Sequence, residues 1–346
     1  MKKCLSSRLL ELAAVATCAL NVTPAAAQSV AEFYGGKQIS LLVGASAGGG
    51  YDALGRLTAR HLGKHIPGHP TIVVQNMPAA GSLAATNHIA ATAPQDGTMI
   101  ALVQRGMLLA KLTNPTGVRF EVGKLNWLAS LASETGVTAA WHTAPHQTGK
   151  DLFEKELIVG GITNVDPETT PKMLNALIGT KFKIITGYPG TREIIPAIER
   201  GEVQGIGDMS ISSLKRARPD WLRDKKVRIL MQIALEKDAE LPGIPFALDY
   251  VKNESDRKAM ELNLTQKTIA RPIVAPPGVP ADRLAALRGA FAALTKDQEF
   301  LADAKKAKIE VSPLAGPAVD KVVAVITGTP PDVAARYATM MAPAKK

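Results

Sequence analysis

The sequence predicts an α/β protein of two lobes, each built on a mainly parallel sheet flanked by helices. Short apolar runs rich in β-branched residues alternate with helical patterns along most of the chain, as in strand–helix–strand units. The same order of strand, loop and helix occurs over residues 39–103 and again over residues 157–208. We therefore expect one lobe from residues 28–138 and 246–346 and a second from residues 139–245, with two crossings of the hinge between them.

The first lobe is predicted to begin with three strands that are separated by two helices. Its strands are expected over residues 39–43, 71–75 and 98–103, and its helices over residues 52–66 and 82–91. Apolar side chains recur along one face of the first helix, which predicts that this face is buried. Pro67 and Gly68 end that helix.

The second lobe is predicted to follow the same plan. Its strands are expected over residues 157–160, 182–186 and 203–206. Pro171 is expected in the first turn of the helix after the first of these strands, with Gly179 just past the end of that helix. Pro196 falls beyond the first turn of a helix counted from Thr191, so we expect this helix to start late or to kink.

The remaining chain is predicted to return to the first lobe and to complete its sheet. It carries strand patterns at residues 227–234 and 268–275, a helix that opens at Pro280, and two shorter helical patterns at residues 317–326 and 332–341. These segments contain no recognisable chemical motif.

Residues 1–27 predict a cleaved secretion signal and hence a secreted protein. A basic start precedes the apolar run at residues 12–20, and the alanines at residues 25–27 offer a cleavage site. That run is too short to anchor the chain across a bilayer. Both cysteines, Cys4 and Cys18, fall in this segment, so the mature chain is predicted to have no disulfide, thiolate metal ligand or cysteine nucleophile. Lipidation of Cys18 stays an open alternative.

The chain is basic, with a formal net charge of +10. This excess favours anionic ligands or surfaces. Nucleic acid is one such partner, but the secretion signal, the low aromatic content and the lack of a dense stripe of lysine and arginine argue against it. We expect no nucleic-acid partner.

Glycine-containing loops at two strand-to-helix junctions, residues 48–50 and 79–82, point to anion binding by the backbone. The first N–H groups of a helix lack internal partners and sit at the positive end of its dipole. Glycine lets a ligand approach these donors closely, so a carboxylate can be held without a basic side chain. Ligands of open α/β sheets bind at the carboxyl ends of the strands, so we expect the site in the cleft between the lobes.

The segment 44–48 also matches G-x-S-x-G, the pattern of a hydrolase nucleophile elbow with Ser46 as the nucleophile. Hydrolases of that fold place the catalytic histidine after the serine and the acid, towards the end of the chain. Here all histidines lie between residues 61 and 146. A secreted serine esterase that uses Ser46 is therefore kept only as an alternative.

His61, His65 and His69 are spaced by four, as zinc ligands can be. Pro67 and Gly68 break the helix before His69, and no glutamate completes an H-E-x-x-H pattern. We therefore expect no metal site, and no cofactor.

Three segments, "LLVGASAGGGYDALGR", "VVQNMPAAGSLAA" and "GYPGTREIIPAIERGEVQG", together resemble the extracytoplasmic solute receptors of tripartite tricarboxylate transporters, the Bug-type periplasmic binding proteins. The resemblance extends over nearly the whole chain after the secretion signal. It implies a two-lobed periplasmic binding protein fold of type II. It also implies a monomer that closes on a small organic carboxylate and delivers it to the membrane permease subunits, with no catalysis and no cofactor. A ligand-binding partner of a sensor system stays open as an alternative.

The resemblance implies that two loops of the first lobe hold the carboxylate, largely through backbone amides and water, while the second lobe closes over it. It assigns Gly48, Gly49, Gly50 and Asp52 to loop one. It assigns Pro78, Ala80, Gly81 and Ser82 to loop two. In the second lobe it assigns Tyr188, Gly190 and Asp208 to the site. The loop residues Ala45, Ser46 and Thr163 complete the predicted site.

The two loops depart from the family pattern at three places. Residues 44–47 replace an aromatic and proline-rich lead-in, Met77 replaces a basic residue, and Leu83 stands near a usual polar one. These departures predict a wider or less polar pocket, and hence a ligand larger or more apolar than a short dicarboxylate. Replacement of Gly81 by valine is expected to weaken binding by blocking the approach of the ligand.

Overall fold

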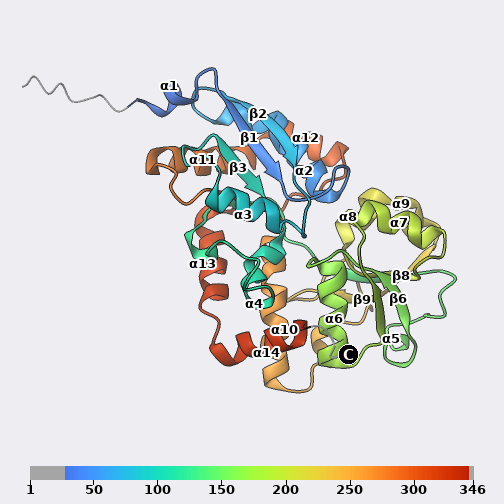
Figure 1. Cartoon of the computed structure of the whole chain (residues 1–346). Coiled ribbons are helices and arrows are strands. Elements are labelled where there is room, and N and C mark those ends of the chain that lie inside the picture. Colours follow the sequence, from blue (N-terminus) through green and yellow to red (C-terminus); the bar gives the residue numbers. More distant parts are fainter. Residues whose placement is uncertain (1–27, 343–346) are drawn as a thin grey trace, which may run out of the picture.

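The computed structural model describes residues 28–342 and divides them between two lobes, each with its own sheet (Figure 1). The predicted secretion signal and both cysteines lie outside the described residues. The middle of the chain, green and yellow in Figure 1, forms the second lobe, and the segments before and after it form the first. No helix within residues 28–342 has the length and apolar character that a membrane span needs.

The sheet of the first lobe contains the strands β1 (Gln38–Val43), β2 (Thr71–Asn76), β3 (Met99–Leu102), β4 (Asn126–Ser130), β10 (Pro272–Ala275) and β11 (Leu314–Ala315). Their order across the sheet is β11-β4-β10-β3-β1-β2. The two late strands, β10 and β11, both pair with β4. The end of the chain therefore completes the first sheet, as predicted.

The sheet of the second lobe contains the strands β5 (Gly136–Trp141), β6 (Leu157–Gly160), β7 (Phe182–Ile185), β8 (Gly205–Ser210) and β9 (Val227–Ile233). Their order is β7-β6-β8-β5-β9. Both sheets are mixed rather than mainly parallel: β1 runs parallel to β2 and β3, and β6 to β7 and β8, while the other pairs are antiparallel. A parallel pair needs a long crossover connection, usually a helix. The parallel strands of the two sheets are connected in this way, by α2 and α3 in the first lobe and by α6 and α7 in the second.

The described helices of the first lobe are α1 (Val30–Tyr34), α2 (Gly50–Leu62), α3 (Leu83–Ala91), α4 (Ala110–Thr113), α10 (Glu254–Thr265), α11 (Ala281–Leu294), α12 (Gln298–Lys306), α13 (Gly316–Thr327) and α14 (Pro331–Met341). Those of the second lobe are α5 (Asp151–Glu154), α6 (Asp166–Ile178), α7 (Thr191–Glu199), α8 (Ile211–Ala217) and α9 (Pro219–Arg223). α2, α11 and α13 pack on the first sheet, and α6 and α7 pack on the second.

The chain first crosses between the lobes after Ser130 and before Gly136, since β5 pairs entirely within the second sheet. It returns between Ile233 and Pro272, and α10, on this return, packs against α14 (Figure 1). The first crossing thus precedes residue 138, where the first lobe was expected to end, because β5 begins at Gly136 and already belongs to the second sheet.

Two helices of the second lobe carry a proline in their interior. α6 begins at Asp166, so Pro167 occupies its first turn and the prediction that Pro171 does so is wrong. The ring of Pro171 instead packs on Gly207 of β8, where a Cβ would lie 2.7 Å from its Cγ atom. α7 begins at Thr191, well before Pro196, so the late start is wrong, while the alternative of a kink at Pro196 stays a prediction.

Candidate ligand-binding cleft

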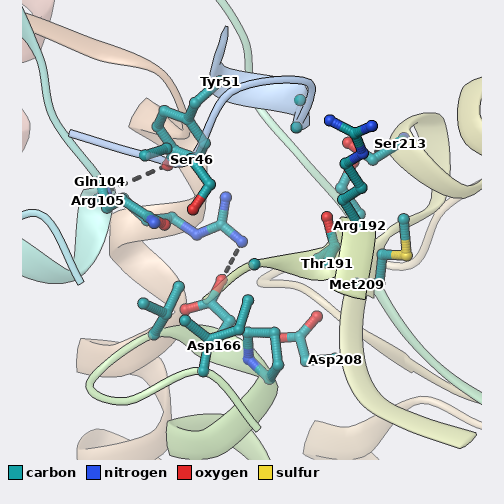
Figure 2. Close-up of a pocket in the computed structure, with 18 of the residues that line it drawn as sticks. Ser46, Tyr51, Gln104, Arg105, Asp166, Thr191, Arg192, Asp208, Met209 and Ser213 are labelled. Atoms are coloured by element: carbon teal, nitrogen blue, oxygen red, sulfur yellow. Dashed lines mark hydrogen bonds and ion pairs between the residues drawn. The ribbon is translucent and has the colours of Figure 1, made fainter. Parts of the chain in front are cut away.

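A cleft of about 90 Å³ lies between the lobes, near the carboxyl ends of β1, β3 and β6 (Figure 2). This is the edge at which open α/β sheets bind ligands. From the first lobe and the crossing segments it is lined by Ala45, Ser46, Gly49, Gly50, Tyr51, Gln104, Arg105, Glu134 and Arg271. From the second lobe it is lined by Ile162, Val165, Asp166, Pro167, Pro189, Gly190, Thr191, Arg192, Asp208, Met209, Ser210 and Ser213.

Two helices, one from each lobe, begin at the cleft with glycine as the residue before the first turn. Gly49 precedes α2 and Gly190 precedes α7, and neither helix receives a side-chain cap. The first backbone N–H groups of both helices therefore lack an intrahelical partner and sit at the positive end of the helix dipole. The missing Cβ atoms let a ligand come close to these groups. Both helix starts can thus contribute to holding an anion.

Arg192 adds a full positive charge to this side of the cleft. It is the second residue of α7, it is exposed, and it forms no ion pair with any residue of the range 28–342. Its guanidinium reaches towards loop one, where Nη1 lies 3.1 Å from the place that a Cβ of Gly48 would take. In Figure 2 the side chain points from the second lobe towards the loop that precedes α2. An anion between these elements would meet the guanidinium as well as the helix starts.

A buried ion-pair network joins the two lobes beside the cleft. Arg105, which follows β3, pairs with Glu134 of the first crossing and with Asp166 at the start of α6 (Figure 2). Arg271, on the return crossing, also pairs with Glu134. Each of the four residues is at most 9% exposed. Because a buried charge that loses its partner is costly, these pairs favour an arrangement in which the lobes touch.

Lys267 extends the network into the second lobe. Its Nζ atom lies 2.6 Å from Oδ2 of Asp208 and 3.4 Å from Oδ2 of Asp166. Burial raises the pKa of Asp208, and the attraction of Lys267 offsets this rise only in part. Burial also acts on Asp166, but Arg105 and Lys267 outweigh it and lower the pKa of this carboxyl to about 2. The acids and bases of the network balance one another, so the attraction for an anion comes from the helix starts and from Arg192.

Tyr51 and Arg271 fill the first-lobe side of the cleft. The guanidinium of Arg271 lies 4.0 Å from the centre of the Tyr51 ring, a cation–π contact. The Tyr51 hydroxyl donates a hydrogen bond of 2.7 Å to the carbonyl of Ala270. The cleft lining is therefore more polar than the departures in the two loops predict, because Arg105 and Arg271 reach it from segments outside those loops.

The structure brings part of the predicted site together. The predicted residues that line the cleft are Ala45, Ser46, Gly49, Gly50, Gly190 and Asp208. Gly48 and Asp52 are absent from the cleft lining, and the Gly48 N–H donates to Oδ2 of Asp52 at 2.8 Å. Asp52 is 3% exposed and also binds Arg56 and Asn76, so it fixes the shape of loop one and does not face the cleft.

Loop two does not reach the cleft. The first N–H groups of α3 are already bonded within the loop, from Leu83 to the carbonyl of Ala80 at 3.2 Å and from Ala84 to that of Ala79 at 3.4 Å. Ser82 is buried, and its Oγ atom accepts from the Gln104 N–H at 3.0 Å. Pro78, Ala80, Gly81 and Ser82 are thus absent from the cleft lining, and Ala80 lines a separate cavity of about 170 Å³.

The two remaining predicted residues also lie outside the cleft lining. The carbonyl of Thr163 abuts Gly81, where a Cβ would lie 2.6 Å from the oxygen, so the lobes meet here without leaving space for a ligand. Tyr188 packs within the second lobe, with Cε2 lying 3.3 Å from the place that a Cβ of Gly160 would take.

The ionic residues of the cleft were largely beyond sequence reasoning. Glu134 and Arg271 lie on the two crossing segments, where no periodic pattern marks a site. Asp166 lies at the start of a helix, where an acid is common for electrostatic reasons alone. Arg105 and Arg192, which follow a predicted strand and a glycine loop, stood at positions that could suggest a site, and Asp208 was among the predicted site residues.

Ser46 lacks the partners of a catalytic serine. Its hydroxyl donates to the carbonyl of Pro189 at 3.1 Å, and no histidine is among the residues that line the cleft. A serine nucleophile needs a base within hydrogen-bond reach. The described part of the chain therefore offers no support for the esterase alternative.

The spaced histidines are held by acidic residues of α12 and its cap. His61 Nε2 lies 3.0 Å from Oδ2 of Asp303, and His65 Nε2 lies 2.9 Å from Oδ2 of Asp297. His61, Asp297 and Glu299 are close enough to share a metal ion, but the ammonium of Lys64 already lies 2.7 Å and 2.5 Å from these two carboxylates. A cation thus occupies this cluster without any metal.

Comparison with solved structures shows the fold class. The periplasmic binding protein BugD matches with a TM-score of 0.67 and 20% identity over 88% of this chain and 97% of that one. A malate-bound MatC from Rhodopseudomonas palustris gives 0.65 and 18% over 88% and 99%. An adipate-bound protein of R. palustris gives 0.67 and 16% over 88% and 97%. The fold is that of a two-lobed periplasmic binding protein, so the predicted fold class is confirmed.

Sequence comparison adds a curated relative. No family model matches the chain. The UPF0065 protein in the gbd 5' region of Cupriavidus necator is 27% identical over 240 residues, which is 67% of this chain and 70% of the relative. The Bug-type and TctC proteins that the sequence resembles are also those whose structures it matches.

Proposed function

We propose that the protein is a periplasmic solute-binding receptor, which captures a small organic carboxylate between its lobes and delivers it to the permease subunits of a tripartite tricarboxylate-type transporter. The observation that carries the proposal is the pair of uncapped helix starts, α2 from one lobe and α7 from the other, at one cleft beside Arg192. A ligand that bridges both lobes stabilises their contact by the interactions that it makes only when they meet.

The structural neighbours support a carboxylate as the ligand. Two of them are described with bound malate and with bound adipate. The periplasmic location rests on the predicted secretion signal and on the likeness to periplasmic proteins. A receptor needs no reacting group, in keeping with a cleft where Ser46 has no neighbouring base.

Calorimetric titration tests the proposal with dicarboxylates, tricarboxylates and aromatic acids, each beside the uncharged amide of the same acid. We expect at least one acid to bind and its amide to fail, because the helix starts and Arg192 favour negative charge. The proposal is overturned if no acid binds, or if acids and amides bind equally well.

A pair of variants on α7 separates the cleft from the general positive charge of the surface. Arg192→Gln is expected to weaken binding of the acid by about tenfold, the loss of one charge-assisted contact. Arg200→Gln removes the same charge at the far end of α7, where the side chain pairs with Glu202. It is expected to leave the affinity unchanged, and an equal loss in both variants contradicts a site at the start of α7.

Delivery to a permease is tested on membranes from cells that make the transporter subunits. We expect the acid-loaded receptor to be retained by these membranes and the unloaded receptor to be retained less. Equal retention of the loaded and the unloaded receptor would contradict delivery to the permease. Retention only by membranes that contain a sensor kinase would support the sensor alternative in place of uptake.

A further inference from the structure

We infer that the separate cavity at loop two is a second ligand site, for an uncharged aromatic molecule with one hydroxyl or N–H group, and that its occupant strengthens the contact between the lobes. This second cavity has a volume of about 170 Å³ and lies between loop two, α4 and α14 of the first lobe and α6 of the second. α14 packs against both α4 and α6 (Figure 1). The second cavity shares no lining residue with the cleft.

Buried apolar side chains form much of the wall of the second cavity. Leu83, Met107, Leu109, Tyr337 and Met341 line it, and each is at most 8% exposed. An apolar cavity of similar size, about 150 Å³, stays dry and binds benzene. Methionine side chains adapt to the shape of a neighbour and make favourable contacts with aromatic rings. The second cavity therefore has the size and the surface that a single aromatic molecule needs.

Polar side chains of the second cavity have partners within the protein. Lys172, the charged residue of its lining, pairs with Glu168 one turn earlier on α6. The Tyr337 hydroxyl donates to Oδ1 of Asn263 at 3.0 Å. The lining thus offers no unpaired charge among the residues that the structure describes, which favours an uncharged occupant.

Gln266 leaves one acceptor over at the second cavity. It lines the cavity and is 2% exposed. Its Nε2 atom donates to Oδ1 of Asn263 at 3.0 Å, whereas its Oε1 atom is buried and has no hydrogen-bond partner within residues 28–342. Because a buried acceptor without a partner is costly, an occupant that donates a hydrogen bond to it is favoured. The hydroxyl of a phenol or the N–H of an indole is such a donor.

Both lobes wall the second cavity, beside the buried ion pair of Arg105 with Asp166. Gly106 follows Arg105, Asn164 stands two residues before Asp166, and both line the cavity. A Cβ of Gly106 would lie 3.3 Å from the carbonyl oxygen of Asn164. An occupant touches both segments, so it adds interactions that exist only while the lobes meet. It should therefore raise the affinity of the cleft for a carboxylate, a consequence that rests on the proposed function.

NMR of isotope-labelled methionine methyl groups locates the occupant, because Met107 and Met341 line the second cavity and Met209 lines the cleft. Single methionine-to-leucine variants assign the three signals. The probes are p-cresol and toluene, which differ by one hydroxyl. We expect p-cresol to shift the signals of Met107 and Met341 and to leave that of Met209 in place, since the ring acts on nearby methyl groups. Shifts at Met209 alone, or no shift with either probe, overturn the second site.

The hydroxyl tests the role of Gln266. We expect wild type to bind p-cresol about threefold to tenfold more tightly than toluene, the effect of one hydrogen bond. Gln266→Met removes the acceptor and keeps an apolar side chain of similar length, so the two probes should bind it equally. Gln298→Met, at an exposed position of α12, is the matched control and should keep the preference of wild type. Equal binding of the probes by wild type, or an unchanged preference in Gln266→Met, overturns the hydrogen-bonded occupant.

Calorimetric titration with malate and adipate, with and without p-cresol, measures the coupling of the two sites. We expect p-cresol to raise the affinity for the acid by about fivefold or more, and the acid to raise that for p-cresol by the same factor, because coupling is reciprocal. Equal affinities with and without p-cresol overturn the coupling. If no acid binds while p-cresol still shifts Met107 and Met341, the proposed function fails and the second site stands.

Discussion

The hydroxyl of Ser46 donates a hydrogen bond of 3.1 Å to the carbonyl oxygen of Pro189, and this bond joins the first lobe to the second at the edge of the cleft. The same serine lies against Gly190, where a Cβ would come within 3.5 Å of its own Cβ. Loop one therefore touches the start of α7 directly. A ligand between α2 and α7 is enclosed by this contact, so Ser46 acts on lobe closure, not on bond breaking.

Ser46→Ala removes one solvent-accessible hydrogen bond between the lobes. Such a bond contributes about 0.5–1.5 kcal/mol, so we expect ligand affinity to fall by about threefold to tenfold. Calorimetric titration measures this change, and a p-nitrophenyl ester serves as the control substrate. Ester hydrolysis by wild type that disappears in Ser46→Ala would contradict a receptor and restore the esterase alternative.

Arg105 is the basic residue that links the two lobes in the buried network. Arg105→Met leaves Glu134 and Asp166 buried without this partner, and we expect the free energy of unfolding to fall by about 3–5 kcal/mol. Urea denaturation measures the loss. Arg223→Met is the matched control, because Arg223 is exposed and pairs only with its neighbour Asp224, and its loss should stay below about 1 kcal/mol. Similar losses in both variants would show that the network adds no stability of its own.

The fold could be predicted because its signals are local, whereas the network could not because its members meet only in space. Apolar strand patterns and helix ends depend on adjacent residues. Gly179, for example, ends α6 with a φ of 78°, a left-handed conformation that glycine adopts without strain. Glu134 and Arg271 meet across the hinge from distant parts of the chain. No sequence pattern around either residue predicts which partner it will pair with.

Loop two shows the limit of a correct local pattern. A glycine before a helix predicts free N–H groups, and this prediction holds for α2 and α7, which have no side-chain caps. At α3, the residues Ala80, Gly81 and Ser82 all have positive φ, which turns the loop tightly enough for its own carbonyls to accept the first N–H groups. The backbone conformation decides whether such donors are free, and residue type alone does not fix it.

Asp166 should make stability depend on acid pH. Folding lowers the pKa of this carboxyl from 3.8 to about 2, so its stabilising effect is complete above about pH 4 and is lost as the pH falls towards 2. The shift corresponds to about 2 kcal/mol. Asp208, whose pKa is raised, acts in the opposite direction: its contribution is present at low pH and declines as the pH rises through its folded-state pKa.

Urea denaturation at several pH values between 5 and 2 measures this dependence. We expect Asp166→Asn to be less stable at pH 5 and to show a smaller decline than wild type below pH 4. Asp332→Asn is the control, since Asp332 is exposed and has no ion pair in the described range. A decline as steep in Asp166→Asn as in wild type would assign the acid sensitivity to other carboxyls.

Gly81→Val tests how the lobes meet outside the cleft. A Cβ at Gly81 would lie 2.6 Å from the carbonyl oxygen of Thr163 and 2.9 Å from a methyl group of Val165, both in the second lobe. The variant is therefore expected to hold the lobes apart, to increase the radius of gyration and to weaken ligand binding by more than about tenfold. The sequence suggested a weaker affinity through a blocked ligand, whereas the structure attributes it to blocked closure.

Gly36→Val is the matched control, because Gly36 has a similar φ of 70° and no atom within 4 Å of its Cβ position. It should carry the same backbone strain and keep both shape and affinity. Small-angle scattering with titration distinguishes the two variants, and an unchanged radius in Gly81→Val together with weak binding would return loop two to the ligand site.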